Sequence, residues 1–142
     1  MPTLSAWGVR LALGWLAIGA LLGALILARV PLGIAGIAVW IPAHAEIMLV
    51  GWTMQLAFAV AHWILPRQGA GQGRGPTWPI VAVFVGLDLG LVLVIGGATL
   101  AGRILEVAAA VGFALQGLPR IRAAGWGATG KGGDLVRLGR SH

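Results

Sequence analysis

The chain has 142 residues, of which 58% are hydrophobic and 10% charged, and its formal net charge is +6. A soluble domain of this length could not bury that much apolar surface, so the composition predicts an integral membrane protein with the lipid bilayer as a partner. Cysteine is absent, which excludes disulfides and Cys-ligated metal sites. The basic residues flank apolar segments, which membrane topology explains, so no nucleic-acid partner is expected.

The first apolar segment predicts a transmembrane helix over residues 4–28. Eighteen uncharged residues separate Arg10 from Arg29, and this length is enough to cross a hydrocarbon core roughly 30 Å thick. No clear cleavage site of small residues follows the segment, so we expect an uncleaved helix and not a signal peptide. Residues 30–42 are apolar but too short to cross a membrane, and we expect them at its surface.

The second segment predicts a helix over residues 42–65, because Pro42 suits a first helical turn and Pro66 ends the apolar run. A Gly-rich basic loop follows at residues 68–77. The last two predicted helices are joined by a short turn that contains glycine and cover residues 79–95 and 101–118. The expected fold class is therefore all-α, an integral membrane bundle of four transmembrane helices.

Residues 1–118 are expected to form the transmembrane domain, and residues 119–142 a flexible, basic, Gly-rich cytoplasmic tail. Pro119 marks the expected end of the fourth helix, since proline interrupts the helical hydrogen bonds. The simplest interpretation of the tail is a solvated anchor of the topology. Binding to anionic lipid or to a partner subunit is the alternative.

Lys and Arg are divided unequally between the two sides of this predicted bundle. Two of them, Arg29 and Arg103, fall on one side. The other side holds the remaining eight: Arg10, Arg67, Arg74, Arg120, Arg122, Lys131, Arg137 and Arg140. Because cytoplasmic segments carry the excess of basic residues, we expect both termini in the cytoplasm and the protein in a bacterial inner (cell) membrane.

The second predicted helix carries a polar stripe. With about 100° of rotation per residue, six residues fall within about 40° of one line: His44, Met48, Gly51, Gln55, Phe58 and His62. Such a stripe should face the bundle interior or a partner, because polar groups facing lipid would remain unsatisfied. His44 and His62 are about 27 Å apart along an ideal helix, so they cannot bind the same metal or haem. Each is a separate candidate metal ligand or a hydrogen-bonded packing residue.

The third predicted helix carries Asp88 near its centre, where an ionised carboxylate is costly and is therefore usually neutral, paired or functional. Glycines on the opposite face are expected to let another helix approach closely; they are Gly86, Gly90 and Gly97. A proton or ion carrier centred on Asp88 is one possible interpretation. Arg103 and Glu106 are spaced for an ordinary salt bridge within the fourth helix.

A family resemblance begins at His44, in the segment HAEIMLVGWTMQ, which continues through FAVAHWILPR to Arg67. This segment resembles the second helix of heme-copper oxidase subunit I, in particular that of C-type oxidases and nitric oxide reductases. In that family a histidine at the outer start of the second helix is an axial ligand of the low-spin haem b. The resemblance therefore implies haem b as the cofactor and His44 as a ligand of its iron, with Met48, Gly51 and Gln55 lining the site.

The resemblance covers residues 44–67 only, and the remaining oxidase ligands lie on helices that this chain lacks. We therefore expect no copper site and no oxygen-reducing enzyme activity from the chain on its own. A second axial ligand would come from another subunit or from His44 of a second copy, which favours a homodimer or a larger complex. His142, the last residue of the tail, is a poor candidate.

Besides the proton or ion carrier centred on Asp88, three functions are compatible with the sequence. The leading hypothesis is a haem b-binding protein that transfers electrons or serves as an accessory subunit of a redox complex. The second is a cofactor-free structural subunit of a larger membrane assembly, which docks through its glycine faces and basic tail. The third is a (bacterio)chlorophyll-binding accessory subunit in which His62, beside Trp63, holds the pigment magnesium. No hydrolytic or phosphate-binding motif is present.

Overall fold

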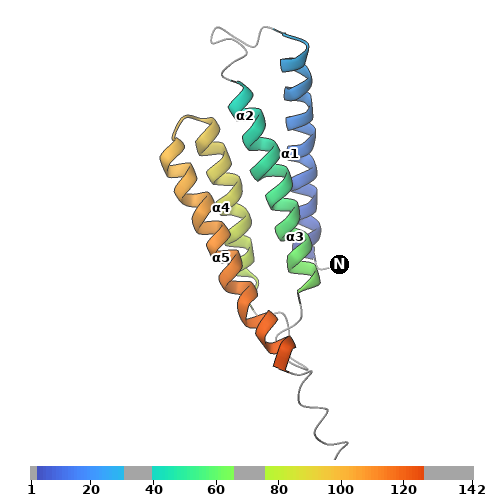
Figure 1. Ribbon diagram of the computed structural model, residues 1–142, viewed down its shortest axis with the longest axis vertical. Helices are drawn as coiled ribbons and strands as arrows, with labels where there is room; N and C mark the ends of the chain where they lie inside the picture. The colour runs from blue at the N-terminus through green and yellow to red at the C-terminus, as the bar shows by residue number, and fades with distance from the viewer. Residues whose placement is uncertain (1–2, 31–39, 66–75, 127–142) are drawn as a thin grey trace, which may run out of the picture.

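The computed structural model describes residues 3–30, 40–65 and 76–126, with side chains up to Arg120. Within these ranges the chain forms four helical rods that run antiparallel to their neighbours in sequence (Figure 1). The elements are α1 (Thr3–Leu27), α2 (Trp40–Glu46), η2 (Ile47–Met54), α3 (Gln55–Ile64), α4 (Trp78–Ile95) and α5 (Thr99–Trp126). Four of the described helical segments are long and apolar enough to cross a membrane. The predicted all-α, four-helix class is confirmed.

The second rod consists of α2, η2 and α3 in direct succession and is called the central rod below. It lies between α1 on one side and the α4–α5 hairpin on the other (Figure 1). The α4–α5 turn, at residues 96–98, marks one end of the bundle, called the hairpin end. The start of α1 and the end of α5 lie at the opposite end, called the terminal end. Which end faces the cytoplasm stays a prediction, and a reporter fused after His142 would test it.

The outer surface of the bundle carries large apolar side chains, as a lipid environment requires. Leu21, Val85 and Leu115 lie on three different helices and are each more than half exposed. The main apolar core lies toward the terminal end and contains Val50, Ala59, Ile80, Val83, Phe84, Leu87 and Ala109. Stacked rings of Phe58 and Phe113, 4.2 Å apart between centroids, join α3 to α5 beside this core.

Small residues allow α1 to approach the central rod closely. The buried residues of α1 are Ser5, Gly8, Ala12 and Gly19, spaced by three, four and seven residues along one helix face. A Cβ atom added at Gly8 would lie 2.8 Å from Phe84 Cζ and 2.9 Å from Ala59 Cβ. This face is therefore filled by the neighbouring helices, and a larger side chain at Gly8 would force them apart.

The hairpin of α4 and α5 is packed closely enough to exclude side chains at two glycines. A Cβ atom at Gly90 would lie 2.7 Å from Glu106 Cγ, and one at Gly102 would lie 2.6 Å from the Gly90 carbonyl oxygen. Gly86 faces Ala109 in the same contact. Gly97 differs from its expected packing role, because it lies in the turn with a φ of +94° and would meet nothing within 4 Å. Glycine is favoured at this position because a positive φ is sterically unfavourable for residues with a Cβ atom.

The boundaries differ from the sequence prediction mainly at α5. The other three rods end within about two residues of the expected positions, a typical uncertainty for helix ends. In contrast, α5 continues through Pro119 to Trp126 instead of ending at Leu118. Proline removes one hydrogen bond to the preceding turn and disfavours the helix, but it does not stop this one. Residues 40–42 of the predicted interfacial segment belong to α2. Most of that segment, of the basic loop and of the predicted tail falls at residues 31–39, 66–75 and 127–142, outside the described residues.

Candidate functional site

His44 lies in the contact between α2 and α1, toward the hairpin end. Its Nδ1 is 2.9 Å from the Gly19 carbonyl oxygen, and since a carbonyl only accepts, Nδ1–H is the donor. The ring edge occupies the space left by Gly23, where an added Cβ atom would lie 2.7 Å from His44 Cε1 and 3.3 Å from Nε2. The hydrogen bond fixes the direction of the ring and places a proton on Nδ1, so Nε2 is the ring nitrogen that this bond does not engage.

Met48 and Gly51 follow His44 along the predicted stripe, but both are committed to helix packing. Met48 Sδ lies against α1, 2.5 Å from where a Cβ atom at Gly19 would be. A Cβ atom at Gly51 would lie 2.8 Å from Trp15 Cγ and 2.9 Å from a Leu91 side-chain carbon. These two residues position the central rod between its neighbours, and the structure does not gather them with His44 and Gln55 around one cavity.

The π-helical segment η2 explains why the stripe is divided. Residues 47–54 follow the wider i→i+5 hydrogen-bonding pattern, so residues beyond them are rotated away from the positions that a uniform α-helix gives. The Thr53 hydroxyl donates to the Met48 carbonyl oxygen, five residues earlier, at 2.8 Å. Before η2, His44 faces α1; after it, Gln55 faces α4 and His62 faces α5. Sequence periodicity assumed one helical phase and could not detect this change.

Asp88 and Gln55 meet near the middle of the bundle. The Trp15 indole N–H donates to Asp88 Oδ1 at 2.7 Å, which joins α1 to α4. The Gln55 amide nitrogen lies 3.5 Å from Asp88 Oδ2. Gln55 is completely buried, and its Oε1 has no hydrogen-bond partner within the described structure. These contacts give Asp88 two hydrogen-bonding neighbours, and both are neutral.

A cluster of three charged side chains lies toward the hairpin end. Arg103 donates to both Glu46 carboxylate oxygens, at 2.6 and 2.5 Å, and to Glu106 at 3.0 Å. The expected pair of Arg103 with Glu106 is present, but Glu46 is the shorter contact and joins the central rod to α5. Sequence analysis did not identify Glu46, although a buried glutamate two residues from His44 on a membrane helix is a signal in itself.

His62 is buried toward the terminal end and faces Arg120 of α5. Arg120 Nη1 lies 3.5 Å from His62 Nδ1. Because a guanidinium has only donors, Nδ1 is the acceptor and the ring proton belongs on Nε2. A neighbouring cation and this tautomer both disfavour a metal at His62. His44 and His62 therefore lie in opposite chemical situations, although the sequence presents them as equivalent.

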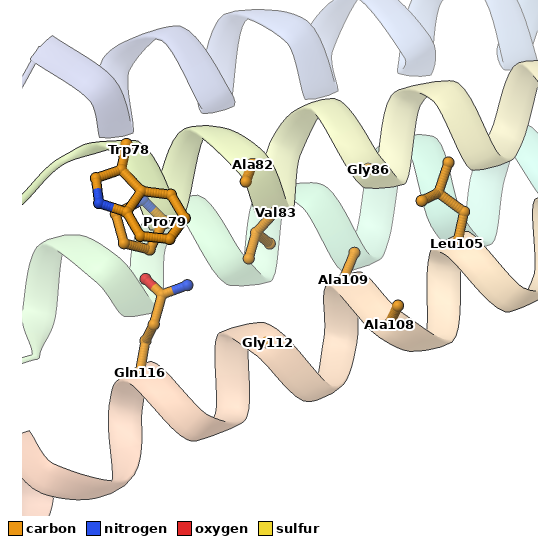
Figure 2. Close-up of a pocket in the computed structure, with 10 residues that line it drawn as sticks. All are labelled: Trp78, Pro79, Ala82, Val83, Gly86, Leu105, Ala108, Ala109, Gly112 and Gln116. Atoms are coloured by element: carbon orange, nitrogen blue, oxygen red, sulfur yellow. The ribbon is translucent and has the colours of Figure 1, made fainter.

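The described surface carries several apolar grooves, one of which, of about 590 Å³, lies between α3 and α5 beside Ala61 and Phe113. Two others bear on the proposals below. One, of about 340 Å³, follows the outer face of the α4–α5 hairpin, and its walls are mostly small residues such as Ala82, Ala108 and Gly112 (Figure 2). Gln116 lies at the same end of this groove as Trp78 and Pro79 (Figure 2). The other groove, of about 560 Å³, lies between α1, the central rod and α4 on the half of the bundle that contains His44. It includes Trp40, which precedes His44 by one helical turn.

Together the rods and their polar contacts define a multi-pass helical membrane protein. Comparisons with protein-family models, with curated proteins and with solved structures found no match to this chain. Among the described residues, no group of three His, Cys, Asp or Glu side chains could hold a metal ion. A haem has a smaller requirement, because the porphyrin supplies the equatorial ligands and the protein supplies the axial ones.

Proposed function

We propose that the protein binds haem b in the membrane and acts in electron transfer or as an accessory subunit of a redox complex. The observation that supports this proposal best is the arrangement of His44. Its Nδ1–H is held by the Gly19 carbonyl, and its ring lies in the space that Gly23 leaves open. A ligating histidine in a protein commonly donates its second ring N–H to a backbone carbonyl in this way. The residues present therefore fit one axial ligand.

The residues around His44 would determine how such a haem is held. His44 Nε2 would bind the iron, while Gly19 and Gly23 would fix the direction of the ring. The groove beside Trp40 and Ile47 offers an apolar surface on the same half of the bundle. When bound, haem b supplies a carrier for one electron, whose potential depends on its axial ligands and burial. A second axial ligand would come from His44 of a second copy or from another subunit, which makes association part of the proposal.

Absorption spectra of purified protein, oxidised and reduced, test the proposal. We expect Soret and alpha bands in the wild type, their loss in His44→Ala and their retention in His62→Ala. Membrane insertion of each variant is measured in parallel, because the four apolar spans do not depend on either histidine. A colourless wild-type protein would contradict the proposal, and so would bands that survive in His44→Ala.

A cofactor-free structural subunit is the second candidate, favoured by the groove along the α4–α5 hairpin. Its small side chains suit the close approach of a helix from a second copy or a larger complex. The glycines expected to dock on a partner, Gly86 and Gly90, instead pack within the chain. Gly112→Leu should weaken association in cross-linking of detergent-solubilised protein, whereas Gly14→Leu, at a position with no neighbour within 4 Å, serves as its control.

A further inference from the structure

Asp88 is set apart from the other charged groups within the described spans by its surroundings. It lies seven residues from the nearer end of α4, roughly 10 Å along the helix axis. Its two hydrogen-bonding neighbours are neutral, the Trp15 indole at 2.7 Å and the Gln55 amide at 3.5 Å. The acidic residues near the hairpin end differ, because both contact the guanidinium of Arg103.

Among the side chains that the structure describes, the titratable and charged ones on the helices around Asp88 are Arg10, His44, Glu46, His62, Arg103, Glu106 and Arg120. None of them forms a hydrogen bond or ion pair with Asp88 in the described structure. Within the central rod, Glu46 and His62 are about 14 and 10 Å along the axis from Gln55. Glu106 packs against Gly90, on the face of α4 turned about 160° from Asp88. An ionised Asp88 would therefore be a carboxylate without a nearby cation, which is costly in a membrane.

The Gln55 side chain gives a separate reason to place a proton on Asp88. Its side chain is completely buried, its amide nitrogen points toward Asp88, and its amide oxygen has no partner. An amide presents two donors on one side and an acceptor on the other, and a half-turn about its last bond exchanges them. In the exchanged orientation Oε1 faces Asp88 Oδ2 and can accept a hydrogen bond from a protonated carboxyl group.

We infer that Asp88, Gln55 and Trp15 form a proton-binding site near the centre of the membrane. With the proton bound, the Asp88 hydroxyl donates to Gln55 Oε1. With the proton released, Asp88 Oδ2 accepts from the Gln55 amide N–H. Trp15 N–H donates to Oδ1 in both states. The ligand is a proton and not a metal cation, because few oxygen atoms converge here and the indole N–H points its positive end at the carboxyl group. The inference does not depend on haem binding.

A hydrophobic carbodiimide tests the protonation of Asp88 in the intact protein. The reagent takes up a carboxylic acid: the acid proton moves to one nitrogen, and a carboxyl oxygen bonds to the central carbon. The acyl group then migrates from that oxygen to a nitrogen. The bond between the carboxyl carbon and the bridging oxygen breaks, and this oxygen stays on the central carbon as the urea carbonyl. The product is a stable N-acylurea that retains the whole reagent mass. The chain has four side-chain carboxyl groups, Glu46, Asp88, Glu106 and Asp134, so peptide mass spectrometry assigns the label without ambiguity.

We expect carbodiimide to label Asp88 near neutral pH faster than Glu46 or Glu106, because both glutamates contact the guanidinium of Arg103 and Asp88 contacts neutral groups only. Asp88→Asn should remove this label, raising the pH should slow it, and sodium at constant ionic strength should leave it unchanged. Faster labelling of Glu46 or Glu106 would overturn the inference. So would an unlabelled Asp88 at both neutral and acidic pH, or protection by sodium, which would indicate a cation site.

Infrared spectroscopy gives a second measurement that a purely structural Asp88 would not affect. The carbonyl stretch of a protonated carboxylic acid should be present in the wild type and absent in Asp88→Asn. Trp15→Phe should move this band to higher frequency, because Oδ1 loses the indole hydrogen bond. Trp7→Phe, a change at an exposed tryptophan of the same helix, is the matched control and should leave the band in place. A band that Trp15→Phe does not shift would contradict the proposed geometry.

Discussion

The two ends of the bundle differ in how the central rod is joined to the neighbouring helices. Toward the hairpin end, charge joins the helices: Arg103 connects Glu46 of the central rod to Glu106 of α5. Toward the terminal end, close packing does so, with Gly8 against Phe84 and Ala59. Polar contacts inside a membrane hold specific partners, whereas small residues bring helix backbones together. The comparison shows that the hairpin end combines ion pairs with a fixed histidine, the elements from which a site can be built.

The histidines of the central rod follow the same division. His44, at the hairpin end, donates from Nδ1 to a backbone carbonyl, and Nε2 takes no part in this bond. His62, at the terminal end, faces the guanidinium of Arg120. Identical side chains on one membrane helix thus differ in their capacity to bind a metal, because the neighbouring helix supplies an acceptor in one case and a cation in the other.

The largest expected effect on stability concerns the charged cluster. Arg103→Met leaves Glu46 and Glu106, each with a side chain less than one-tenth exposed, without their cation. We expect a loss of about 3 kcal/mol in the free energy of unfolding, measured in detergent mixtures with increasing sodium dodecyl sulfate. Glu46→Gln should cost less, because Arg103 retains Glu106 and is half exposed. Equal losses in the two variants would contradict the expectation that the two buried glutamates depend on the charge of Arg103.

Close packing at the terminal end can be tested with a matched pair of glycine variants. Gly8→Val places side-chain atoms against Phe84 and Ala59, so we expect a loss of about 1–3 kcal/mol by the same measurement. Gly14→Val makes the same change on the same helix where no atom lies within 4 Å, and its effect should be much smaller. If both variants lose the same free energy of unfolding, the loss comes from the low helix propensity of valine and not from its packing against the neighbouring helices.

Asp88 lies between the two ends and tests the polar contacts of the middle. Asp88→Asn preserves shape and hydrogen-bonding capacity toward Gln55, and we expect nearly normal assembly. Asp88→Leu leaves the Trp15 N–H without its acceptor and should weaken packing by about 1–3 kcal/mol. Unfolding curves of the two variants in the same detergent test whether Asp88→Leu is less stable than Asp88→Asn. A fully tolerated leucine would mean that Asp88 has no structural role.

The smallest expected effect, and the one most specific to the site, concerns Gly23. Gly23→Ala places a Cβ atom 2.7 Å from His44 Cε1 and should displace the ring without removing it. We expect haem affinity to fall by about tenfold, the lower range for loss of a group that orients a ligand. Haem titration of the apoprotein measures this change, with Gly14→Ala as the control. An unchanged haem affinity in Gly23→Ala would mean that the contact of His44 with α1 does not orient the ring for haem binding.

The sequence was sufficient to predict the four apolar rods, because length and hydropathy alone determine which segments can cross a membrane. It was also sufficient to identify Asp88, which a membrane interior makes conspicuous. The division of the polar stripe could not be predicted, since a π-helical segment at Ile47–Met54 leaves no periodic signal. Nor could the bond from Arg103 to Glu46, which joins residues 57 apart in the chain through tertiary packing.

Chemical rescue tests the proposal that His44 Nε2 is an axial ligand of haem iron. His44→Gly removes the ring and leaves a space that free imidazole can occupy. We expect the variant to lack the Soret and alpha bands and to regain them when haem and imidazole are added together. His62→Gly should bind haem without imidazole. Soret and alpha bands in His44→Gly without imidazole would contradict this proposal. So would a variant that is inserted and folded but does not regain the bands when imidazole is added.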